Sequence, residues 1–295
     1  MVRSNYIRRD EALDDLWQNS VSSGINFAKY DDIKVAVKGE NQPKPIESFA
    51  EGGFAPLLRS NIQRAKYSCP TPVQKYAIPI IRDRRDLMAC AQTGSGKTAA
   101  FLFPMLDRLL RENPPARSSQ GIPKATPQVV IMAPTRELVT QTYDEARKFS
   151  GGSDILVANV YGGTSVFQQL QVLDRGCNIL VATPGRLLDF VERGKISFES
   201  VQFLVLDEVN IFIYLLLSLD SCYFQADRML DMGFKRQIDL CVHHNTMSRD
   251  RTTLMFSATF PHEIQRCARE YLDRSHLFLQ VGIVGGACSG EFERF

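Results

Sequence analysis

The feature that most constrains the fold of this chain is a glycine-rich turn between an apolar run and a helical pattern. The turn reads Ala91-Gln-Thr-Gly-Ser-Gly-Lys-Thr98 and follows the apolar run Leu87–Cys90. Small residues at Gly94 and Gly96 allow backbone N–H groups to close around an anion at the N-terminus of the following helix. A strand, such a loop and a helix are the context of a phosphate-binding P-loop, and an ordinary glycine-rich turn is the alternative.

The residue types of this loop predict nucleotide chemistry. Lys97 is expected to reach the β and γ phosphates, and the Thr98 hydroxyl is expected to coordinate Mg²⁺. Ala91 stands where the general pattern G-x-x-x-x-G-K-[ST] has its first glycine. The expected phosphate-binding positions are Gln92, Thr93, Gly94, Ser95, Gly96, Lys97 and Thr98.

The rest of the chain alternates strand-like and helix-like segments. Helical spacing occurs at Thr98–Leu110, Glu137–Phe149 and His262–Leu272. Because several apolar runs are apolar at consecutive positions, we expect strands that are covered on both faces. This pattern predicts an α/β fold with a mostly parallel sheet and helices on both faces. The runs are Asp86–Ala91, Gln128–Ala133, Ile155–Tyr161, Asn178–Ala182, Val201–Leu206, Thr252–Phe256 and Leu277–Val281, and Ile33–Val37 alternates like a further strand.

Composition narrows the class of protein. The chain has 295 residues, 44% of them hydrophobic, which is enough to bury a core without disulfides. Its seven cysteines never lie closer than 19 positions, so zinc-finger spacing is absent and a disulfide framework is not expected. The net charge of +2 leaves nucleic-acid binding open, because a local basic groove can coexist with a nearly neutral total.

Targeting signals and membrane segments are not expected. Met1–Asp10 is polar, with no apolar run behind it, and so does not resemble a signal peptide. The most apolar stretch, Ile211–Leu217, is far too short to span a bilayer. We therefore expect a reduced, soluble, intracellular protein with no membrane partner.

An acidic pair follows one of the predicted buried strands. Asp207-Glu208 comes directly after Val201–Leu206, where a Walker B carboxylate would hold Mg²⁺ beside the phosphates. Alone, such a pair more often begins a solvated loop. After a P-loop at this distance, it favours a nucleotide site.

Together these motifs resemble the first RecA-like domain of DEAD-box RNA helicases, and within that family the Vasa and Belle type. The resemblance extends from about Phe49 to Gly286. It implies an ATP-dependent helicase in which ATP and RNA clamp two domains together and separate a short RNA duplex. In that role Lys97 and Thr98 hold phosphate and Mg²⁺, Asp207 holds Mg²⁺, and Glu208 orients the attacking water.

The family reads adenine with an upstream aromatic residue and a glutamine, to which Phe49 and the segment Tyr67-Ser-Cys-Pro-Thr-Pro-Val-Gln74 correspond. A glutamine amide can donate and accept at once, as the adenine edge demands, and Phe49 can stack on the base. Cys69 replaces the usual basic residue. The alternatives are that Phe49 belongs to the core and Gln74 to a helix surface.

Three segments resemble those that grip the RNA sugar-phosphate backbone without reading sequence. They contribute Pro134, Thr135 and Arg136, then Gly163 of the Gly162-Gly163 pair, then Thr183, Gly185 and Arg186. A surface ion pair with a helix carboxylate is the alternative for each arginine. Ser257-Ala-Thr259 resembles the segment that couples hydrolysis to RNA release by bonding the last Asp of Asp-Glu-Ala-Asp, although alone it would be a strand-end turn.

The Asp-Glu-Ala-Asp motif is interrupted. Val209–Gln225 separates Asp207-Glu208 from Ala226-Asp227, and removing it restores the family motif. Twelve of its seventeen residues are apolar, which is unlike a solvated loop. Because its first and last residues allow codons beginning with GT and ending with AG, our hypothesis is a translated retained intron; a genuine insert is the alternative. Asp227 must then return to meet Ser257 and Thr259.

We expect residues 1–45 to form a partly flexible extension with a short amphipathic helix around Leu13–Trp17. Residues 46–283 would form the RecA-like ATP-binding domain, with an anomalous insert at 209–225, and residues 284–295 would begin a truncated interdomain linker. The expected cofactors are ATP and Mg²⁺, the partner is RNA, and the location is the cytoplasm, the nucleus or RNA granules. The alternative is a non-catalytic nucleotide- or RNA-binding fragment without turnover. A P-loop small-molecule kinase is disfavoured, because Thr183–Arg186 and Ser257–Thr259 have no role there.

Overall fold

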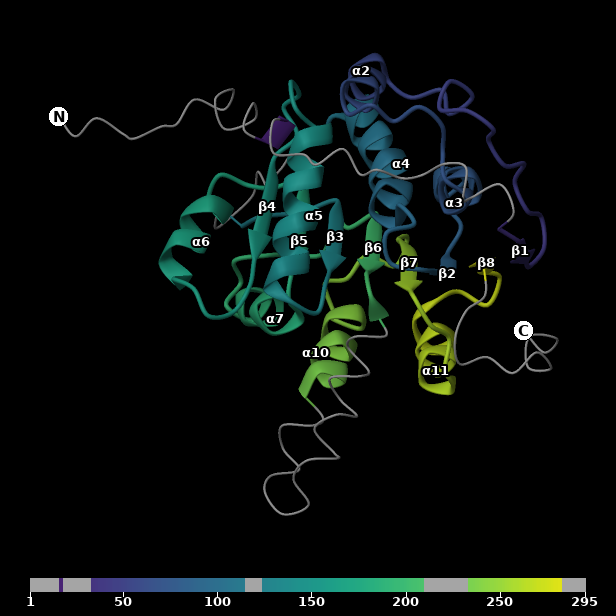
Figure 1. Ribbon diagram of the computed structural model, residues 1–295. Coiled ribbons are helices and arrows are strands. Elements are labelled where there is room, and N and C mark those ends of the chain that lie inside the picture. The colour runs from purple at the N-terminus through teal and green to yellow at the C-terminus, as the bar shows by residue number, and fades with distance from the viewer. Residues whose placement is uncertain (1–15, 18–32, 115–123, 210–232, 283–295) are drawn as a thin grey trace.

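The central element of the computed structural model, which describes residues 16–17, 33–114, 124–209 and 233–282, is an eight-stranded sheet. The strand order is β1-β8-β2-β7-β6-β3-β5-β4, and every neighbouring pair is parallel except the antiparallel β1 and β8 (Figure 1). The strands are β1 (Val35–Lys38), β2 (Leu87–Ala91), β3 (Val129–Met132), β4 (Val157–Val160), β5 (Ile179–Ala182), β6 (Phe203–Leu206), β7 (Thr252–Ser257) and β8 (Leu277–Val281).

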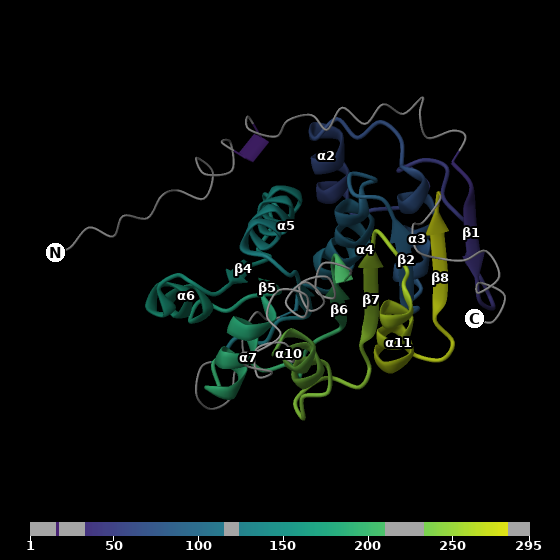
Figure 2. The same cartoon turned by 60° about the horizontal axis from the view of Figure 1, so that its bottom comes forward.

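Helices cover both faces of the sheet, as predicted. Of the helices in the described ranges, four pack into one hydrophobic core and four into the other, and Figure 2 shows α7, α10 and α11 on the side of the sheet opposite α2 to α5. The first group is α2 (Pro56–Arg64), α3 (Pro72–Arg82), α4 (Lys97–Glu112) and α5 (Arg136–Phe149); the second is α6 (Val166–Leu173), α7 (Pro184–Glu192), α10 (Gly233–Val242) and α11 (His262–Tyr271). The predicted α/β class with a mostly parallel sheet is confirmed.

Strand β2 shows why the apolar runs are continuous rather than alternating. Leu87 and Ala89 face the first core, whereas Met88 and Cys90 face the second, and all are fully buried. Since successive side chains point to opposite faces, a strand between two helical layers needs apolar residues at every position. A fully buried Leu or Met contributes about 1.5–3 kcal/mol relative to an exposed one.

The ends of the parallel strands determine where the chemistry gathers. β2 lies between β7 and β8, with β6 beyond β7, and these four strands run in the same direction. Their carboxyl ends therefore lie at one edge of the sheet, where the following loops lead into helices. The P-loop, the acidic pair after β6 and the Ser257 segment all leave the sheet at this edge.

The predicted apolar runs all contain strands, and the alternating run at Ile33–Val37 contributes β1 at the edge of the sheet. The sequence patterns gave no range for α2, α3, α6, α7 or α10. The helix expected around Leu13–Trp17 lies mostly outside the described residues. Within the parts of the chain that the structure describes, no helix is both long and apolar enough to cross a membrane.

Candidate functional site

The glycine-rich loop connects β2 to α4, which begins at Lys97 directly after Gly96. Gly94 and Gly96 have φ angles of 81° and 90°, which side chains disfavour. A Cβ on Gly96 would lie 2.5 Å from Nε2 of Gln74, so only glycine allows this close approach. Residues 92–94 are exposed, while Ser95 is buried and its hydroxyl has no partner among the described residues. The loop thus fits a phosphate group at the N-terminus of α4.

Lys97 lies at the base of the loop and is paired with an acid from the neighbouring strand end. Its Nζ donates to the carbonyl of Ala91 at 3.0 Å and lies 2.8 Å from Oε1 of Glu208. Both side chains are less than one tenth exposed. The other carboxylate oxygen of Glu208 is buried without a partner among the described residues, and Glu208 has a φ of 52°. A strained backbone and an unsatisfied buried oxygen are typical of functional sites.

Asp207 immediately follows β6 and is 4% exposed. Burial and the neighbouring charge of Glu208 raise the pKa of its carboxyl to about 7, against the lowering effect of Lys97. Oδ1 of Asp207 accepts a hydrogen bond from the Glu208 amide at 3.0 Å. A perturbed carboxyl beside a phosphate-binding loop fits a site for a divalent cation, which would favour its charged form.

Within the described residues no three His, Cys, Asp or Glu side chains come together as a metal site. Mg²⁺ usually takes one or two protein ligands together with substrate phosphates and waters. Asp207 and Thr98, at the first turn of α4, fit that pattern.

Gln74 connects the first turn of α3 to the P-loop. Its side chain is completely buried: Oε1 accepts from the Thr71 amide at 2.9 Å, and Nε2 donates to the Gly96 carbonyl at 3.1 Å. The alternative of a helix-surface residue is therefore wrong. One amide hydrogen and one acceptor site remain for a ligand, so a role in reading a base stays a prediction.

Phe49 and Tyr67 belong to an aromatic cluster beside α4. Their ring centroids lie 6.1 Å apart, and each ring also meets Phe103 edge to face. Both side chains are half-buried against the first core, and burial raises the pKa of the Tyr67 hydroxyl. Phe49 thus has a structural role, and stacking on a base stays a prediction.

Two of the segments predicted to grip RNA lie at helix starts on the same edge of the sheet. Thr135 precedes α5, and its hydroxyl accepts from the Leu138 amide at 3.3 Å. Thr183 precedes α7, whose first residue is Pro184. Helix N-termini carry partial positive charge and unpaired N–H groups, so both positions suit phosphate oxygens.

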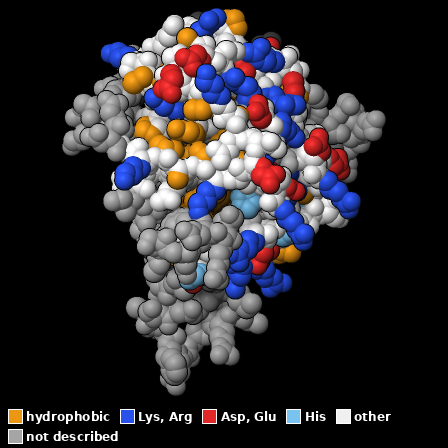
Figure 3. All heavy atoms as spheres, turned by 90° about the vertical axis from the view of Figure 1, so that its right-hand side faces the viewer, with side chains coloured by type: hydrophobic (Ala, Val, Ile, Leu, Met, Phe, Trp, Pro, Cys, Tyr) orange, Lys and Arg blue, Asp and Glu red, His pale blue; other side chains and the backbone are white. Residues whose placement is uncertain are grey.

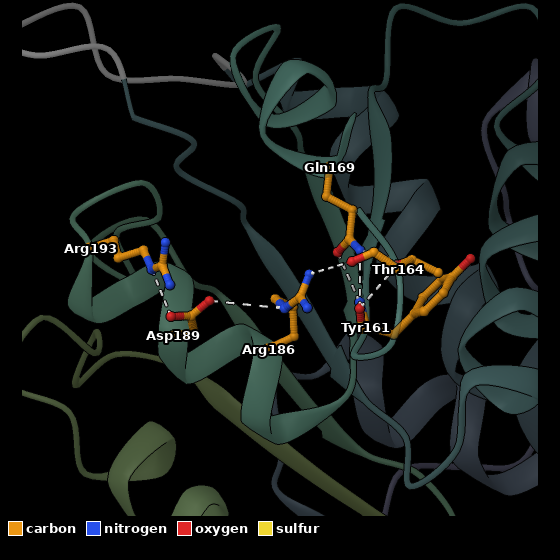
Figure 4. Close-up of polar contacts among 6 residues, drawn as sticks. All are labelled: Tyr161, Thr164, Gln169, Arg186, Asp189 and Arg193. Atoms are coloured by element: carbon orange, nitrogen blue, oxygen red, sulfur yellow. Dashed lines mark hydrogen bonds and ion pairs between the residues drawn. The ribbon is translucent and has the colours of Figure 1, made fainter. Parts of the chain in front are cut away.

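The third segment is the loop that follows β4, where Gln169 of α6 bonds Tyr161 and Thr164 (Figure 4). Arg186 approaches the same loop, with Nη1 3.5 Å from the carbonyl of Thr164, and its Nε lies 3.9 Å from Oδ2 of Asp189. Arg186 thus forms the ion pair with a helix carboxylate that was the alternative to RNA binding, although the two groups are far apart for such a pair. Gln169 and Thr164 were not predicted, because bonds across a loop leave no periodic signal in a sequence.

Arg136 points to this loop from α5. Its Nη1 lies 3.5 Å from the Gly163 carbonyl, and among the described residues it has no ion pair with a carboxylate. Gly163 has a φ of 77°, and a Cβ there would lie 2.8 Å from Nη1 of Arg136. Gly185 is likewise close to Gln237 of α10. The left-handed φ favours glycine at position 163, and at both positions a Cβ would displace the end of a long side chain.

Ser257 ends β7, next to the strand that carries Asp207. Leu206 pairs with Met255 in the sheet, so Asp207 and Ser257 leave neighbouring strand ends. Ser257 is fully buried, and its hydroxyl accepts from the Thr259 amide at 3.3 Å. The Thr259 hydroxyl is buried without a partner among the described residues. Asp227, its predicted partner, lies outside the described residues, as does the predicted insert except for buried Val209.

Comparison with known proteins bears directly on these motifs. Residues 71–215 match the DEAD/DEAH box helicase family. The chain is 48% identical over 275 residues to the ATP-dependent RNA helicase vasa of Drosophila melanogaster, covering 93% of this chain and 38% of that protein. It therefore spans well under half the length of this relative. The family match ends within the segment 209–225.

Solved structures resemble the fold. The RNA helicase Prp28 of Chaetomium thermophilum, solved with bound ADP, has a TM-score of 0.68 and 34% identity, over 84% of this chain and 54% of that one. A DEAD box protein of Methanococcus jannaschii has a TM-score of 0.64 and 30% identity, over 80% of this chain and 56% of that one. Both are longer than the region they share with this chain.

Proposed function

We propose that this chain, which belongs to the DEAD/DEAH box helicase family, is the ATP-binding half of an ATP-dependent RNA helicase. The observation that carries the proposal is the buried pair of Lys97 and Glu208, 2.8 Å apart, beside Asp207 at the base of the P-loop. Lysine, two acids and a glycine-rich helix start are the parts that phosphoryl transfer to water requires.

The proposed cofactors are ATP and Mg²⁺. Lys97 and the loop amides would hold the phosphates, Thr98 and Asp207 would hold the metal, and Glu208 would orient the attacking water. Bound Mg²⁺ would neutralise charge that develops on the phosphate oxygens. Phe49, Tyr67 and Gln74 would recognise adenine, with Gln74 acting on both the base and the loop.

The proposed substrate is RNA, held through its sugar-phosphate backbone. Arg136 and Arg186 converge on the loop after β4, and the starts of α5 and α7 lie on the same edge of the sheet. Such contacts bind phosphates without reading sequence and weaken as salt increases. Ser257, Thr259 and Asp227 would couple hydrolysis to release. Because its substrate is RNA, we place the protein in the cytoplasm, the nucleus or RNA granules.

A complete cycle would need a second RecA-like domain. The chain covers 38% of vasa and 54% of Prp28. We propose that residues 46–283 form the first domain, that 284–295 begin the linker and that 1–45 are an extension. Charge on the far side of the γ phosphate, which an arginine finger supplies, is worth about 10³–10⁵ in rate. The 295-residue chain should therefore hydrolyse ATP slowly.

The test measures ATP binding and RNA-stimulated ATP hydrolysis by the same purified chain. We expect MgATP to bind and Lys97→Ala to abolish binding, while Arg193→Ala, an exposed change on the α7 side, leaves it intact. Slow hydrolysis should depend on RNA and disappear in Glu208→Gln. If ATP binds but hydrolysis is unaffected by RNA and by Glu208→Gln, the chain is the non-catalytic binder of the alternative hypothesis.

A further inference from the structure

A pocket of about 370 Å³ lies at the edge of the sheet opposite the P-loop. Its lining comes from the starts of strands: Asp86 precedes β2, Thr253 is near the start of β7, and Ser275 precedes β8. None of these positions belongs to the nucleotide and RNA site described above. We call this the arginine pocket, because Arg84, Arg85, Arg249 and Arg251 line it.

The arginines of this pocket bond mainly to backbone carbonyls, which do not cancel their charge. Arg84 donates to the Asp250 carbonyl at 2.6 Å, with the Asp250 carboxylate farther away at 3.8 Å. Arg85 donates to the carbonyl of Ser275 at 2.6 Å and, at longer distances, to carbonyls of the loop after β1. Three of the four guanidinium groups therefore lack an ion-pair partner among the described residues.

Arg249 and Arg251 complete the positive lining. Arg249 is exposed, and no carboxylate of the described residues lies within ion-pair distance. Arg251 donates to the Ser248 carbonyl at 3.0 Å, while its Nε is buried without a partner among the described residues. An arginine that has no ion pair in the described part of the chain leaves its charge available to an anion in the pocket.

The two acids that line the pocket accept hydrogen bonds from backbone amides, and the charge of Asp86 also acts on Arg84 and Arg251. Asp86 accepts from the amides of Thr253 at 2.7 Å and Asp273 at 2.8 Å. Asp273 accepts from the amide and hydroxyl of Ser275. Four arginines and two aspartates line the pocket, and the Asp250 carboxylate lies 3.8 Å from Arg84, so these groups together carry one positive charge in excess.

A neighbouring pocket differs in how its arginines are paired. It has a volume of about 410 Å³ and includes Arg82 of α3 and Arg108 and Arg111 of α4. There the two arginines of α4 each have a carboxylate, since Arg108 lies 2.7 Å from Glu112 and Arg111 lies 3.0 Å from Asp107, whereas Arg82 donates to the Gly52 carbonyl. The face seen in Figure 3 likewise shows acidic and basic side chains intermixed.

We propose that the arginine pocket binds the doubly charged phosphate of a small phosphate monoester. A dianion is attracted to these arginines more strongly than a singly charged carboxylate is. Arginine forks match the oxygens of phosphate, and the volume lies within the range of small-molecule sites. The ligand would reach the pocket independently of nucleotide, which occupies the other edge of the sheet.

The experiment is calorimetric titration of glycerol 3-phosphate into the full chain saturated with Mg²⁺ and a non-hydrolysable ATP analogue. That analogue fills the P-loop, so phosphate must bind elsewhere. Because the second pKa of a phosphate monoester is about 6, affinity should rise about fourfold between pH 5.5 and pH 7.5. Methyl sulfate, a monoanion at both pH values, should bind weakly and without pH dependence.

Variants locate the binding. Arg249 is exposed and forms no hydrogen bond or ion pair with the described residues, so Arg249→Ala removes none of their contacts and should weaken binding about tenfold. Arg85→Lys, which keeps charge but loses the fork, should also weaken it. Arg108→Ala, in the neighbouring paired pocket, should leave it unchanged. The proposal is overturned if glycerol 3-phosphate gives no binding, if binding is independent of pH, or if Arg249→Ala binds as tightly as the unaltered chain.

Discussion

Replacing Gln74 tests whether one buried amide both shapes the P-loop and selects adenine. Its Oε1 accepts from the Thr71 amide and its Nε2 donates to the Gly96 carbonyl. In Gln74→Met, which keeps much of the volume, the Thr71 N–H loses its partner, at a cost of about 1–3 kcal/mol. The Gly96 carbonyl keeps the Ala100 amide, so that loss is about 0.5–1.5 kcal/mol.

The expected destabilisation of Gln74→Met is therefore about 3 kcal/mol, and Gln74→Ala adds a cavity cost. Urea unfolding of the nucleotide-free chain measures both changes. Comparing the two variants separates the hydrogen bonds from the lost volume. A change below about 1 kcal/mol in Gln74→Met would show that these bonds do not hold the first turn of α3 against the loop.

Nucleotide selection needs a separate measurement, since a loosened loop weakens every nucleotide. The dissociation constants of MgATP and MgGTP should both increase in the Gln74 variants. If Gln74 reads adenine, the ATP constant increases more and the preference for ATP disappears. An equal increase for both nucleotides would refute base reading and leave Gln74 as a positioning residue for the loop.

Three further predictions concern other parts of the fold. Burial and Glu208 raise the pKa of Asp207 to about 7, above its value of about 4 in an unfolded chain, so the nucleotide-free protein loses stability as pH rises through this window. Asp207→Asn should remove that loss. Equal free energies of unfolding for the unaltered chain at pH 5 and pH 7.5, measured in urea, would contradict the prediction. Gly163→Ala should displace Arg136 and weaken RNA binding, whereas Gly162→Ala, with open space around its Cβ, should not; equal RNA affinities would count against the role of Arg136. Deleting Val209–Gln225 should raise the melting temperature, because it removes an apolar run and a loop-closure cost of about 2.5 kcal/mol; a lower temperature would favour a genuine insert.

The strands could be predicted because burial on both faces imposes the same demand at each position. Every residue of β2, β3, β5 and β6 is buried, so continuous apolar runs were the expected pattern. The P-loop could be predicted equally well, because local backbone geometry requires its glycines. Helix α6 was harder to detect, because Phe167 and Val172 are exposed and blur its amphipathic pattern.

Long-range polar contacts could not be read from the sequence. Gln74 meets Gly96, and Lys97 meets Glu208, through packing that brings distant segments together. Sequence periodicity does not show whether a glutamine at the start of a helix is buried or exposed. The same is true of Gln169, because its hydrogen bonds to the loop after β4 depend on how α6 is oriented relative to that loop.

The arginine pocket has a simpler explanation that must be weighed against a ligand. Parallel strands place helix C-termini near the strand starts, and cations are favoured there by the helix dipole. Arg84 and Arg85 follow directly after α3 and fit that explanation. Arg249 and Arg251 lie in the segment before β7, well past the end of α10 at Val242, and share the pocket with the C-terminal end of α11 at Tyr271. Arg249 is exposed and has no carboxylate of the described residues within ion-pair distance, and this is why Arg249→Ala is the decisive variant.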